Sequence, residues 1–444
     1  MDISFILDRL QQYADSTAIV SNGIEYTFKD VLDQYHELLE FLEREHIANN
    51  SVVAVHSDFN SRSVALFLAL VRKNCIFVPL SLGVKAVEKC INIAQCQALI
   101  DITDNQISLR KTGIKSTHPM LRKLISCDSP GMVLFSSGTT GEPKAALHDL
   151  VFLLEKFKHQ GKKLNTVTFL LYDHIGGFNT MVYTLVNGGM MVTLKERTAD
   201  EVCSLIEKYR LDLLPTSASF INLILLNQSY RKYDLSSLKT ITYGTEPMPQ
   251  STLEAMHRIM PDVLMKQTYG LSEVGIMPTK SENSSSLWMK LRNDENFQTK
   301  IVDDILYIKS RSAMMGYLNH ESPFDEDGWF NTKDKVLVKG DYVKILGRTT
   351  DLINVGGQKV YPIDVESEYL KCPGVRDIRV FGVPNPVLGQ VVSAEVEVSG
   401  ENNNREFIKK LRRYGKEHLD AYMIPATFKL TENKLYSERF KKKR

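Results

Sequence analysis

The sequence predicts an α/β fold, with a large N-terminal domain of layered, mostly parallel sheets and helices and a small α+β C-terminal domain. Three observations support this class. The 444 residues exceed what one hydrophobic core usually organises. Helical patterns alternate with short apolar runs over most of the chain, as in parallel sheets. Near Asp334 this alternation gives way to short strands and a compact β/α pattern.

The elements of the large domain follow one another in a regular order. Residues 28–46 carry leucines at helical spacing, and the polar break Asn49-Asn50-Ser51 separates them from the first apolar strand. We then expect a strand at 52–55, a helix at 61–72, strands at 76–80, 167–171 and 190–194, a helix at 199–209 and a strand at 213–214.

The small domain begins where the pattern changes. Strands at 336–338 and 342–346 lead to Gly347, and we place the boundary there, between domains 1–347 and 348–444. Roughly 95 residues are enough for an independent unit. Its expected elements are a helix after Pro362, strands at 378–383 and 391–398, and a helix at 405–418.

Composition and charge are those of an ordinary globular protein. The formal charge of +2 gives no reason to expect a nucleic-acid partner. The cysteines are scattered without a Cys-x-x-Cys pair, which fits a reducing compartment. The first residues lack the basic start of a signal peptide, and the longest apolar run, residues 64–71, is too short to span a bilayer. We therefore expect a cytoplasmic protein without integral membrane association.

Residues 136–144 have the composition of a phosphate-binding loop. Their sequence is Ser-Ser-Gly-Thr-Thr-Gly-Glu-Pro-Lys, and they follow an apolar strand at 132–135. Glycines let backbone N–H groups turn toward an anion, hydroxyls donate further hydrogen bonds, and Lys144 adds a positive charge. The Gly-Lys-Ser/Thr ending of a P-loop is absent. A flexible polar turn is the plain alternative, but the order of residues favours phosphate binding.

This loop resembles the signature of the adenylate-forming superfamily, which contains acyl-CoA synthetases, peptide-synthetase adenylation domains and luciferases. Stretches similar to its other motifs follow in the family's order over nearly the whole chain. They are residues 26–28, 70–79, 243–247, 267–273, 316–319, 328–334, 347–353 and 356–362. The chain departs from the usual pattern at Asn74-Cys75, at Ser272, and at Lys333, where glycine is usual.

The resemblance implies a binding site for ATP. Thr139, Thr140 and Lys144 would hold the β- and γ-phosphates. Tyr269 would pack on adenine, and Asp334 would accept hydrogen bonds from the ribose. The other nucleotide-binding candidates are Ser136, Ser137, Gly138, Gly141, Gly244, Thr245, Glu246, Gly270, Ser272 and Arg348.

The resemblance also implies a metal ligand and a catalytic lysine. Glu273 would hold Mg²⁺, a hard cation that suits a carboxylate and phosphate oxygens. The superfamily's Gly-Lys-x-x-Arg signature aligns with residues 437–444, with Lys441 at the lysine position and Phe440 at the glycine position. Because the glycine is lost, Lys442 is an alternative. A basic run at a chain end is usually a solvated tail, but the distance of this run from Pro425 fits the superfamily.

Residues 172–178 occupy the stretch where the superfamily gates its acid pocket. His174 matches the histidine common in acyl-CoA ligases. Asp173 is similar to the aspartate with which amino-acid-activating members hold an ammonium group, or alternatively it caps the helix that begins near Gly176. The other candidates for the pocket wall are Ser217, Phe220, Tyr243, Gly244 and Gly270.

The implied reaction has two steps. The carboxylate of a small acid attacks the α-phosphate of ATP, and a thiol then attacks the adenylate and expels AMP. The first step joins two anions, so a lysine and Mg²⁺ are needed more than a general base. The superfamily rotates its small domain between the steps; here the pivot would be Thr350, and the Gly356-Gly357 loop would line the path of the thiol.

The acceptor thiol is the main alternative that the sequence leaves open. Coenzyme A is favoured, and the phosphopantetheine of a carrier protein acting in trans is the alternative, because we recognise no carrier segment in these residues. A non-catalytic nucleotide-binding relative is a further alternative, against which the retention of Lys144, Glu273 and Asp334 argues. Nothing in the sequence supports a light-emitting oxygenase.

Overall fold

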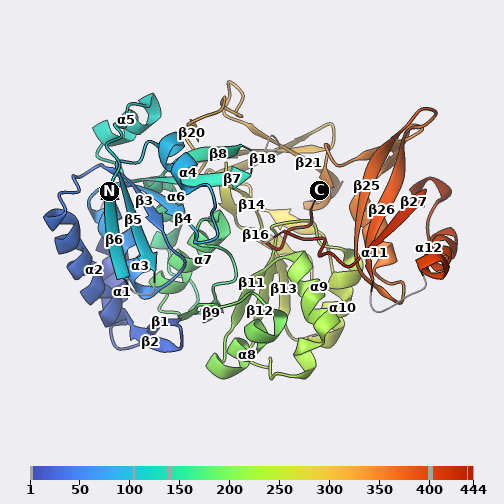
Figure 1. The fold of residues 1–444 in the computed structure, drawn as a ribbon, viewed down its shortest axis with the longest axis horizontal. Helices are drawn as coiled ribbons and strands as arrows, with labels where there is room; N and C mark the ends of the chain where they lie inside the picture. The colour runs from blue at the N-terminus through green and yellow to red at the C-terminus, as the bar shows by residue number, and fades with distance from the viewer. Residues whose placement is uncertain (1–3, 104–105, 138–141, 399–403, 438, 444) are drawn as a thin grey trace.

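A computed structural model describes residues 4–103, 106–137, 142–398, 404–437 and 439–443. The fold is α/β, as predicted: a large N-terminal part contains sheets with helices packed around them, and the last quarter of the chain forms a smaller sheet beside it (Figure 1). No helix within these ranges is both long and apolar enough to cross a membrane.

The first sheet has the strand order β20-β8-β7-β4-β3-β5-β6. Its centre is parallel, with Val52 opposite Ile76 between β3 and β4. The strands are β3 (Val52–His56), β4 (Ile76–Leu80), β5 (Ala98–Thr103), β6 (Gln106–Lys111), β7 (Gly131–Ser137), β8 (Pro143–Asp149) and β20 (Gly316–Tyr317). The neighbouring helices are α1 (Ser4–Gln12), α2 (Phe28–Arg44), α3 (Ser61–Arg72), α4 (Val87–Ala94), α5 (Pro119–Ser126) and α6 (Leu150–Glu155).

Helices α2 and α3 begin where their capping residues place them. The Thr27 hydroxyl accepts from the backbone N–H of Asp30, whose carboxylate accepts from the backbone N–H of Thr27, so α2 starts with a capping box. Asn60 and Ser63 make the same exchange at the start of α3. Because α2 has one apolar face, its inner residues join the core.

The second sheet has the order β13-β12-β11-β9-β10-β1-β2. Its strands are β1 (Thr17–Ser21), β2 (Ile24–Thr27), β9 (Thr166–Val167), β10 (Met191–Val192), β11 (Leu213–Thr216), β12 (Thr240–Tyr243) and β13 (Leu264–Gln267). Its helices are α7 (Ile175–Val186), α8 (Ala199–Tyr209), α9 (Ala218–Asn227) and α10 (Gln250–Ile259). The strand predicted at 167–171 is shorter than expected, because after Thr168 the chain turns into the loop that leads to α7. The strand predicted at 190–194 is limited to Met191–Val192.

The third sheet, of order β16-β17-β22-β21-β19-β18, is antiparallel. The predicted parallel character therefore holds only for the first two sheets. The strands are β16 (Thr279–Ser281), β17 (Met289–Leu291), β18 (Phe297–Val302), β19 (Ile305–Ser310), β21 (Phe330–Lys339) and β22 (Tyr342–Arg348), beside the hairpin of β14 (Tyr269–Leu271) and β15 (Gly275–Met277). The predicted domain boundary at residue 347 lies at the end of β22.

The C-terminal sheet has the order β24-β23-β26-β25, and β27 pairs with β26. Its elements are β23 (Ile353–Val355), β24 (Gln358–Val360), α11 (Pro362–Tyr369), β25 (Val375–Asn385), β26 (Gly389–Val398), α12 (Asn404–His418) and β27 (Thr427–Thr431). Residues such as Tyr369, Ile378 and Val396 are buried together in a hydrophobic core of their own, which is what an independent folding unit requires.

The C-terminal sheet docks on the large part through a few polar contacts. The Asn222 side chain donates to the carbonyl of Arg376 at 3.0 Å, and the backbone N–H of Ser251, in α10, donates to the hydroxyl of Ser367, in α11, at 3.2 Å. The chain end then runs back along the large part (Figure 1). This tail, described at residues 435–437 and 439–443, carries much of the candidate site.

Candidate active site

The predicted phosphate loop joins the antiparallel strands β7 and β8, in which Ser136 pairs with Lys144. Asn319 holds the start of β8: it accepts from the backbone N–H of Ala145 at 3.0 Å and donates to the carbonyl of Pro143 at 2.9 Å. This fixes the backbone on either side of Lys144. The candidates Gly138, Thr139, Thr140 and Gly141 and the side chain of Ser137 lie outside the described residues.

A cation and a carboxylate meet beside this loop. The Lys144 ammonium lies 5.3 Å from the centroid of the Tyr317 ring, and the Tyr317 hydroxyl donates to Glu273 Oε1. Burial and the Glu273 charge raise the pKa of Tyr317, so its hydroxyl remains a donor. The structure thus brings both Lys144 and Glu273 to Tyr317, the former near its ring and the latter at its hydroxyl.

The candidate ribose site is a buried carboxylate held by two donors. The Tyr269 hydroxyl donates to Asp334 Oδ2, and Arg348 Nε lies 3.6 Å from Oδ1. Burial raises the pKa of Asp334, and the Tyr269 bond and the Arg348 charge oppose that rise. Lys333, immediately before it, has φ +60°. This left-handed conformation explains why a glycine is usual at that position.

Position 244 has room for glycine but not for a side chain. A Cβ added there would lie 2.0 Å from the carbonyl oxygen of Thr268. Two residues further, Glu246 accepts from the backbone N–H groups of Ser219, at 2.7 Å, and of Lys442, at 2.8 Å. Glu246 therefore joins the start of α9 to the C-terminal tail.

The remaining predicted residues in the described part of the chain have mainly structural surroundings. The Ser217 hydroxyl accepts from the backbone N–H of Phe220 as the N-cap of α9. Tyr243 is 1% exposed and belongs to the core. Gly270 belongs to β14, and Ser272 follows it in the turn toward β15.

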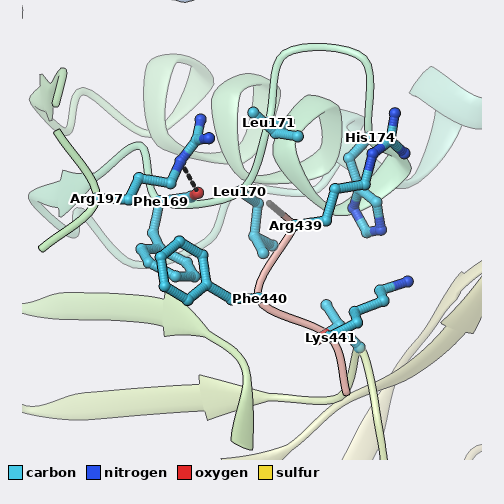
Figure 2. Close-up of a pocket in the computed structure, with 9 residues that line it drawn as sticks. Phe169, Leu170, Leu171, His174, Arg197, Arg439, Phe440 and Lys441 are labelled. Atoms are coloured by element: carbon cyan, nitrogen blue, oxygen red, sulfur yellow. Dashed lines mark hydrogen bonds between the residues drawn. The ribbon is translucent and has the colours of Figure 1, made fainter. Parts of the chain in front are cut away.

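A cavity lies where the tail meets the loop before α7 (Figure 2). About 300 Å³ of space there is not filled by atoms, and this figure includes space open to solvent. The large part supplies His174 and Thr245, which were predicted, and further lining residues, which were not. The residues that sequence reasoning missed are Phe169, Leu170, Leu171, Arg197 and Arg439. The tail also contributes Phe440 and Lys441 to the wall.

His174 is a neutral histidine at the edge of this cavity. Its Nδ1 accepts from the backbone N–H of Gly176 at 3.0 Å and caps α7. Burial, with the charges of Lys441 and Arg439 nearby, lowers the pKa of His174 to about 3. Because Nδ1 accepts, the proton of the neutral ring must lie on Nε2.

Asp173 is not the helix cap, and this corrects one of the two roles considered for it. Its carboxylate is 2% exposed and pairs with Arg439, at 2.9 Å, from the tail. Oδ1 has no hydrogen-bond partner among the described residues. Arg439 thus contacts one oxygen, Oδ2, of the carboxylate that was considered for binding an ammonium group.

The register of the tail is set by Phe440. Its φ is +50°, the left-handed conformation that glycine adopts most readily. Its ring centroid lies 5.4 Å from that of Phe169 and 5.2 Å from that of Phe220. Phe440 therefore has a backbone conformation open to glycine, and its ring packs as an apolar anchor.

The two candidate lysines face different environments. Lys441 lines the cavity below His174 (Figure 2), and burial, with Arg439 nearby, lowers its pKa. Lys442 lies in the small domain, where its ammonium is 2.6 Å from Asp377 Oδ1 and donates to the carbonyl of Ile378 at 2.7 Å. Although burial alone would lower it, the Asp377 charge raises the pKa of Lys442. Of the two, Lys441 lines the cavity and Lys442 anchors the tail.

Among the residues that sequence reasoning missed, Arg439 left a usable signal. It stands two positions before Lys441, so a tail that directs Lys441 into the cavity also brings Arg439 to it. Arg197 left none, because it precedes α8 in a charged stretch, Lys195-Glu196-Arg197, that reads as a solvated loop.

Comparison with known families shows two matches along the chain. The family described as AMP-binding enzyme matches residues 7–318, and the one described as AMP-binding enzyme C-terminal domain matches residues 364–441. Together these matches cover the phosphate-loop region, the cavity and the tail as far as Lys441.

Curated relatives are similar over much of the chain. The protein named 4-coumarate–CoA ligase-like 9 of Arabidopsis thaliana is 27% identical over 69% of this chain and 60% of its own length, so the chain spans less than two thirds of that relative. The protein named 2-succinylbenzoate–CoA ligase of Bacillus cereus is 21% identical over 95% of this chain and 93% of its own length.

Solved structures share the fold. The anthranilate CoA ligase AuaEII in complex with anthranoyl-AMP has a TM-score of 0.81 at 19% identity and covers 99% of this chain and 94% of its own. ATP-bound MatB from Rhodopseudomonas palustris has a TM-score of 0.75 at 19% identity and covers 99% and 97%. At these identities the likeness concerns the fold.

Proposed function

The chain belongs to the AMP-binding enzyme family, and from this premise we propose that it uses ATP to activate a carboxylic acid as an acyl-adenylate and then passes the acyl group to the thiol of coenzyme A. The observation that carries the proposal is the position of Lys441. Lys441 lines the cavity together with neutral His174 and with Thr245, and there a carboxylate could approach a nucleotide.

In the first step an oxygen of the substrate carboxylate attacks the α-phosphate and pyrophosphate leaves. Lys441 would hold the two anions together, and Lys144 would attract the departing phosphates. His174, with its proton on Nε2, would donate a hydrogen bond without adding charge. These groups would act as fixed dipoles and charges in the site, and the docked tail would exclude water from it.

The nucleotide and its metal ion have suitable groups nearby. Asp334 is buried and held by Tyr269, so it could accept from the ribose hydroxyls. Glu273 gives one oxygen to Tyr317, and its second oxygen fits Mg²⁺ alongside phosphate oxygens. The ion would neutralise charge on the phosphates when bound. No cluster of three or more His, Cys, Asp or Glu side chains suited to a metal occurs in the described ranges.

We infer that the acid lacks an α-ammonium group. Asp173, the residue with which an amino-acid-activating member would bind that group, is already paired with Arg439. The relatives named above as CoA ligases support coenzyme A as the acceptor.

ATP–pyrophosphate exchange over a panel of acids tests the first half of the proposal. We expect exchange with at least one acid, and its loss in Glu273→Gln with the fold retained by circular dichroism. Thioester formation is then compared between coenzyme A and phosphopantetheinylated carrier proteins. Exchange with no acid in the panel would contradict the proposed activity, and transfer to a carrier protein alone would contradict the acceptor.

A further inference from the structure

One buried histidine near the phosphate loop has no role in the proposed reaction. His148 lies in β8 and is 0% exposed. Neither of its ring nitrogens has a hydrogen-bond partner within the described ranges. A neutral imidazole carries one N–H donor and one acceptor nitrogen, and buried polar groups of folded proteins are nearly always paired. The N–H of His148 therefore needs an acceptor.

The alternation of β8 places His148 on the same face as Lys144. Side chains two residues apart lie on one face of a strand, so Lys144, Ala146 and His148 share a face. Ala146 packs with Tyr317 on this face, and the Tyr317 hydroxyl donates to Glu273. His148 is thus two positions along β8 from the residue that packs against the partner of Glu273.

The turn that carries Glu273 is linked to β8 through two adjacent residues. The backbone N–H of Met314 donates to the carbonyl of Glu273 at 2.8 Å, and that of Met315 donates to the carbonyl of Leu147 at 2.7 Å. Leu147 immediately precedes His148 in β8. A side chain at residue 148 therefore lies where the turn and the strand are joined.

The ring of His148 is influenced by the backbone of this turn. Burial lowers the pKa of His148 to about 4, and the backbones of Ser272 and Ser312 oppose that shift. Backbone groups have this effect on a histidine through their carbonyls, which accept from a ring N–H. Ser272 immediately precedes Glu273, so its carbonyl belongs to the turn that carries the carboxylate.

We propose that His148 is a positioning residue for Glu273: in the nucleotide-bound protein its ring N–H donates to the carbonyl of Ser272 and holds the turn, and with it the Glu273 carboxylate, in place for the metal ion. This inference rests on the proposed function and adds a residue to its metal site. His148 acts through the backbone of the turn and contacts neither the nucleotide nor the ion.

The test is a double-mutant cycle on the full chain, measured as ATP binding by calorimetry in the absence of any acid. His148→Phe keeps an aromatic ring and removes the N–H. We expect MgATP to bind about tenfold more weakly to this variant than to the wild type, the effect of one hydrogen bond, whereas ATP in EDTA should bind to both within about twofold. In a Glu273→Gln background, His148→Phe should weaken MgATP binding no further, because residues that act on one ligand are not additive.

Two further variants serve as rescue and control. His148→Gln supplies a side-chain N–H donor and should restore part of the MgATP affinity. His257, on α10, also has a ring nitrogen, Nδ1, without a partner in the described part of the chain. His257→Phe is therefore the matched control and should leave the MgATP affinity unchanged.

The outcomes separate this inference from the proposed function. Equal weakening of ATP binding with and without Mg²⁺, or an additive loss in the Glu273→Gln background, would leave His148 as a residue of the core and overturn the positioning role alone. Binding of ATP to the wild type that Mg²⁺ does not strengthen would overturn this inference together with the metal site of the proposed function. Mg²⁺-dependent binding without exchange for any acid would overturn the activity and leave the role of His148 standing. Circular dichroism checks the fold of each variant, and His148→Leu replaces His148→Phe in the cycle if the latter does not fold.

Discussion

A phenylalanine at residue 440 adopts the backbone conformation of a glycine. A left-handed conformation costs a non-glycine residue about 1–2 kcal/mol, and the contacts of the Phe440 ring with Phe169 and Phe220 offset that cost. The conformation is needed because it sends Lys441 and Lys442 to different environments. A single residue therefore fixes which lysine reaches the cavity.

Lys441→Ala should separate the two half-reactions. We expect adenylate formation to fall by about 10²–10³-fold, the effect of removing one charge-assisted donor. Conversion of a supplied acyl-adenylate and coenzyme A to thioester should remain, because Lys441 has no role in that step. The measurement is pyrophosphate exchange beside single-turnover thioester formation. Lys443→Ala removes an exposed lysine and is the control; equal losses in both steps would refute the assignment.

His174 should make the protein less stable in acid. Its pKa is about 3 in the folded protein against 6.5 in an unfolded chain. Above pH 6.5 both states are neutral and no penalty arises. Between these two values only the unfolded chain gains the proton, so the free energy of unfolding falls by up to about 1.4 kcal/mol per pH unit as pH decreases.

The variant His174→Asn tests this and keeps an N-cap acceptor for α7. Urea unfolding between pH 7 and pH 5 should show a shallower pH dependence in the variant than in the wild type. Identical slopes would mean that His174 takes up its proton in the folded state.

At the scale of elements, the site depends on how closely the ends of strands approach one another. The end of β12 passes the Thr268 carbonyl so closely that a side chain at residue 244 has no room. A side chain at residue 244 could be accommodated only if the end of β12 moved, and Thr245 and Glu246 would move with it.

Gly244→Ala should therefore lower both stability and nucleotide affinity. We expect about 1–3 kcal/mol of destabilisation, as for other overpacked sites, and weaker ATP binding by calorimetry. Gly83→Ala is the matched control, because an added Cβ there meets nothing within 4 Å. Wild-type stability in Gly244→Ala would show that the strand end yields easily.

Lys442 links the tail to β25, and its burial changes the effect expected from removing its side chain. A solvated lysine could be removed at little cost, but the Lys442 and Asp377 side chains are 10% and 8% exposed. Lys442→Ala leaves a buried carboxylate unpaired and should cost about 3 kcal/mol or more. Thermal denaturation measures the loss. Lys442→Met combined with Asp377→Leu should recover most of it; a double variant as unstable as Lys442→Ala would contradict the pairing.

Local sequence patterns predicted those helices well whose signals lie within the helix itself. The helix expected at 61–72 is α3 (Ser61–Arg72), and that expected at 199–209 is α8 (Ala199–Tyr209), because apolar periodicity and capping residues lie within them. The site is harder to predict, because Arg197 and Arg439 line one cavity only when the tail is docked on the large part. Asp173 illustrates the limit: its role is set by a partner 266 residues away.

At the scale of the whole molecule, the site is divided between two domains. The tail brings Lys441, Arg439 and Phe440 to a wall that the large domain only partly builds. The predicted second step needs the Gly356-Gly357 loop in this place instead, so the small domain would have to rotate, with Thr350 as the proposed pivot.

Thr350→Pro should restrict that rotation, because proline fixes φ near −65°. If the docked arrangement is the adenylating one, thioester formation should fall by a larger factor than pyrophosphate exchange. Thr349→Ala is a neighbouring control that leaves the backbone free. Equal effects on both half-reactions would place the pivot elsewhere.

The tail contacts the large domain through Arg439 with Asp173 and through the Lys442 N–H with Glu246. Because the acid would bind where the tail docks, tail docking and acid binding are thermodynamically reciprocal. An acid that binds the docked form more tightly by some factor must increase the docking equilibrium by that same factor. The fraction of molecules with a protected tail, measured by limited proteolysis or hydrogen exchange, should therefore rank acids by their differential affinity before any bond is made. An acid that binds without protecting the tail would occupy the site in a form unable to react.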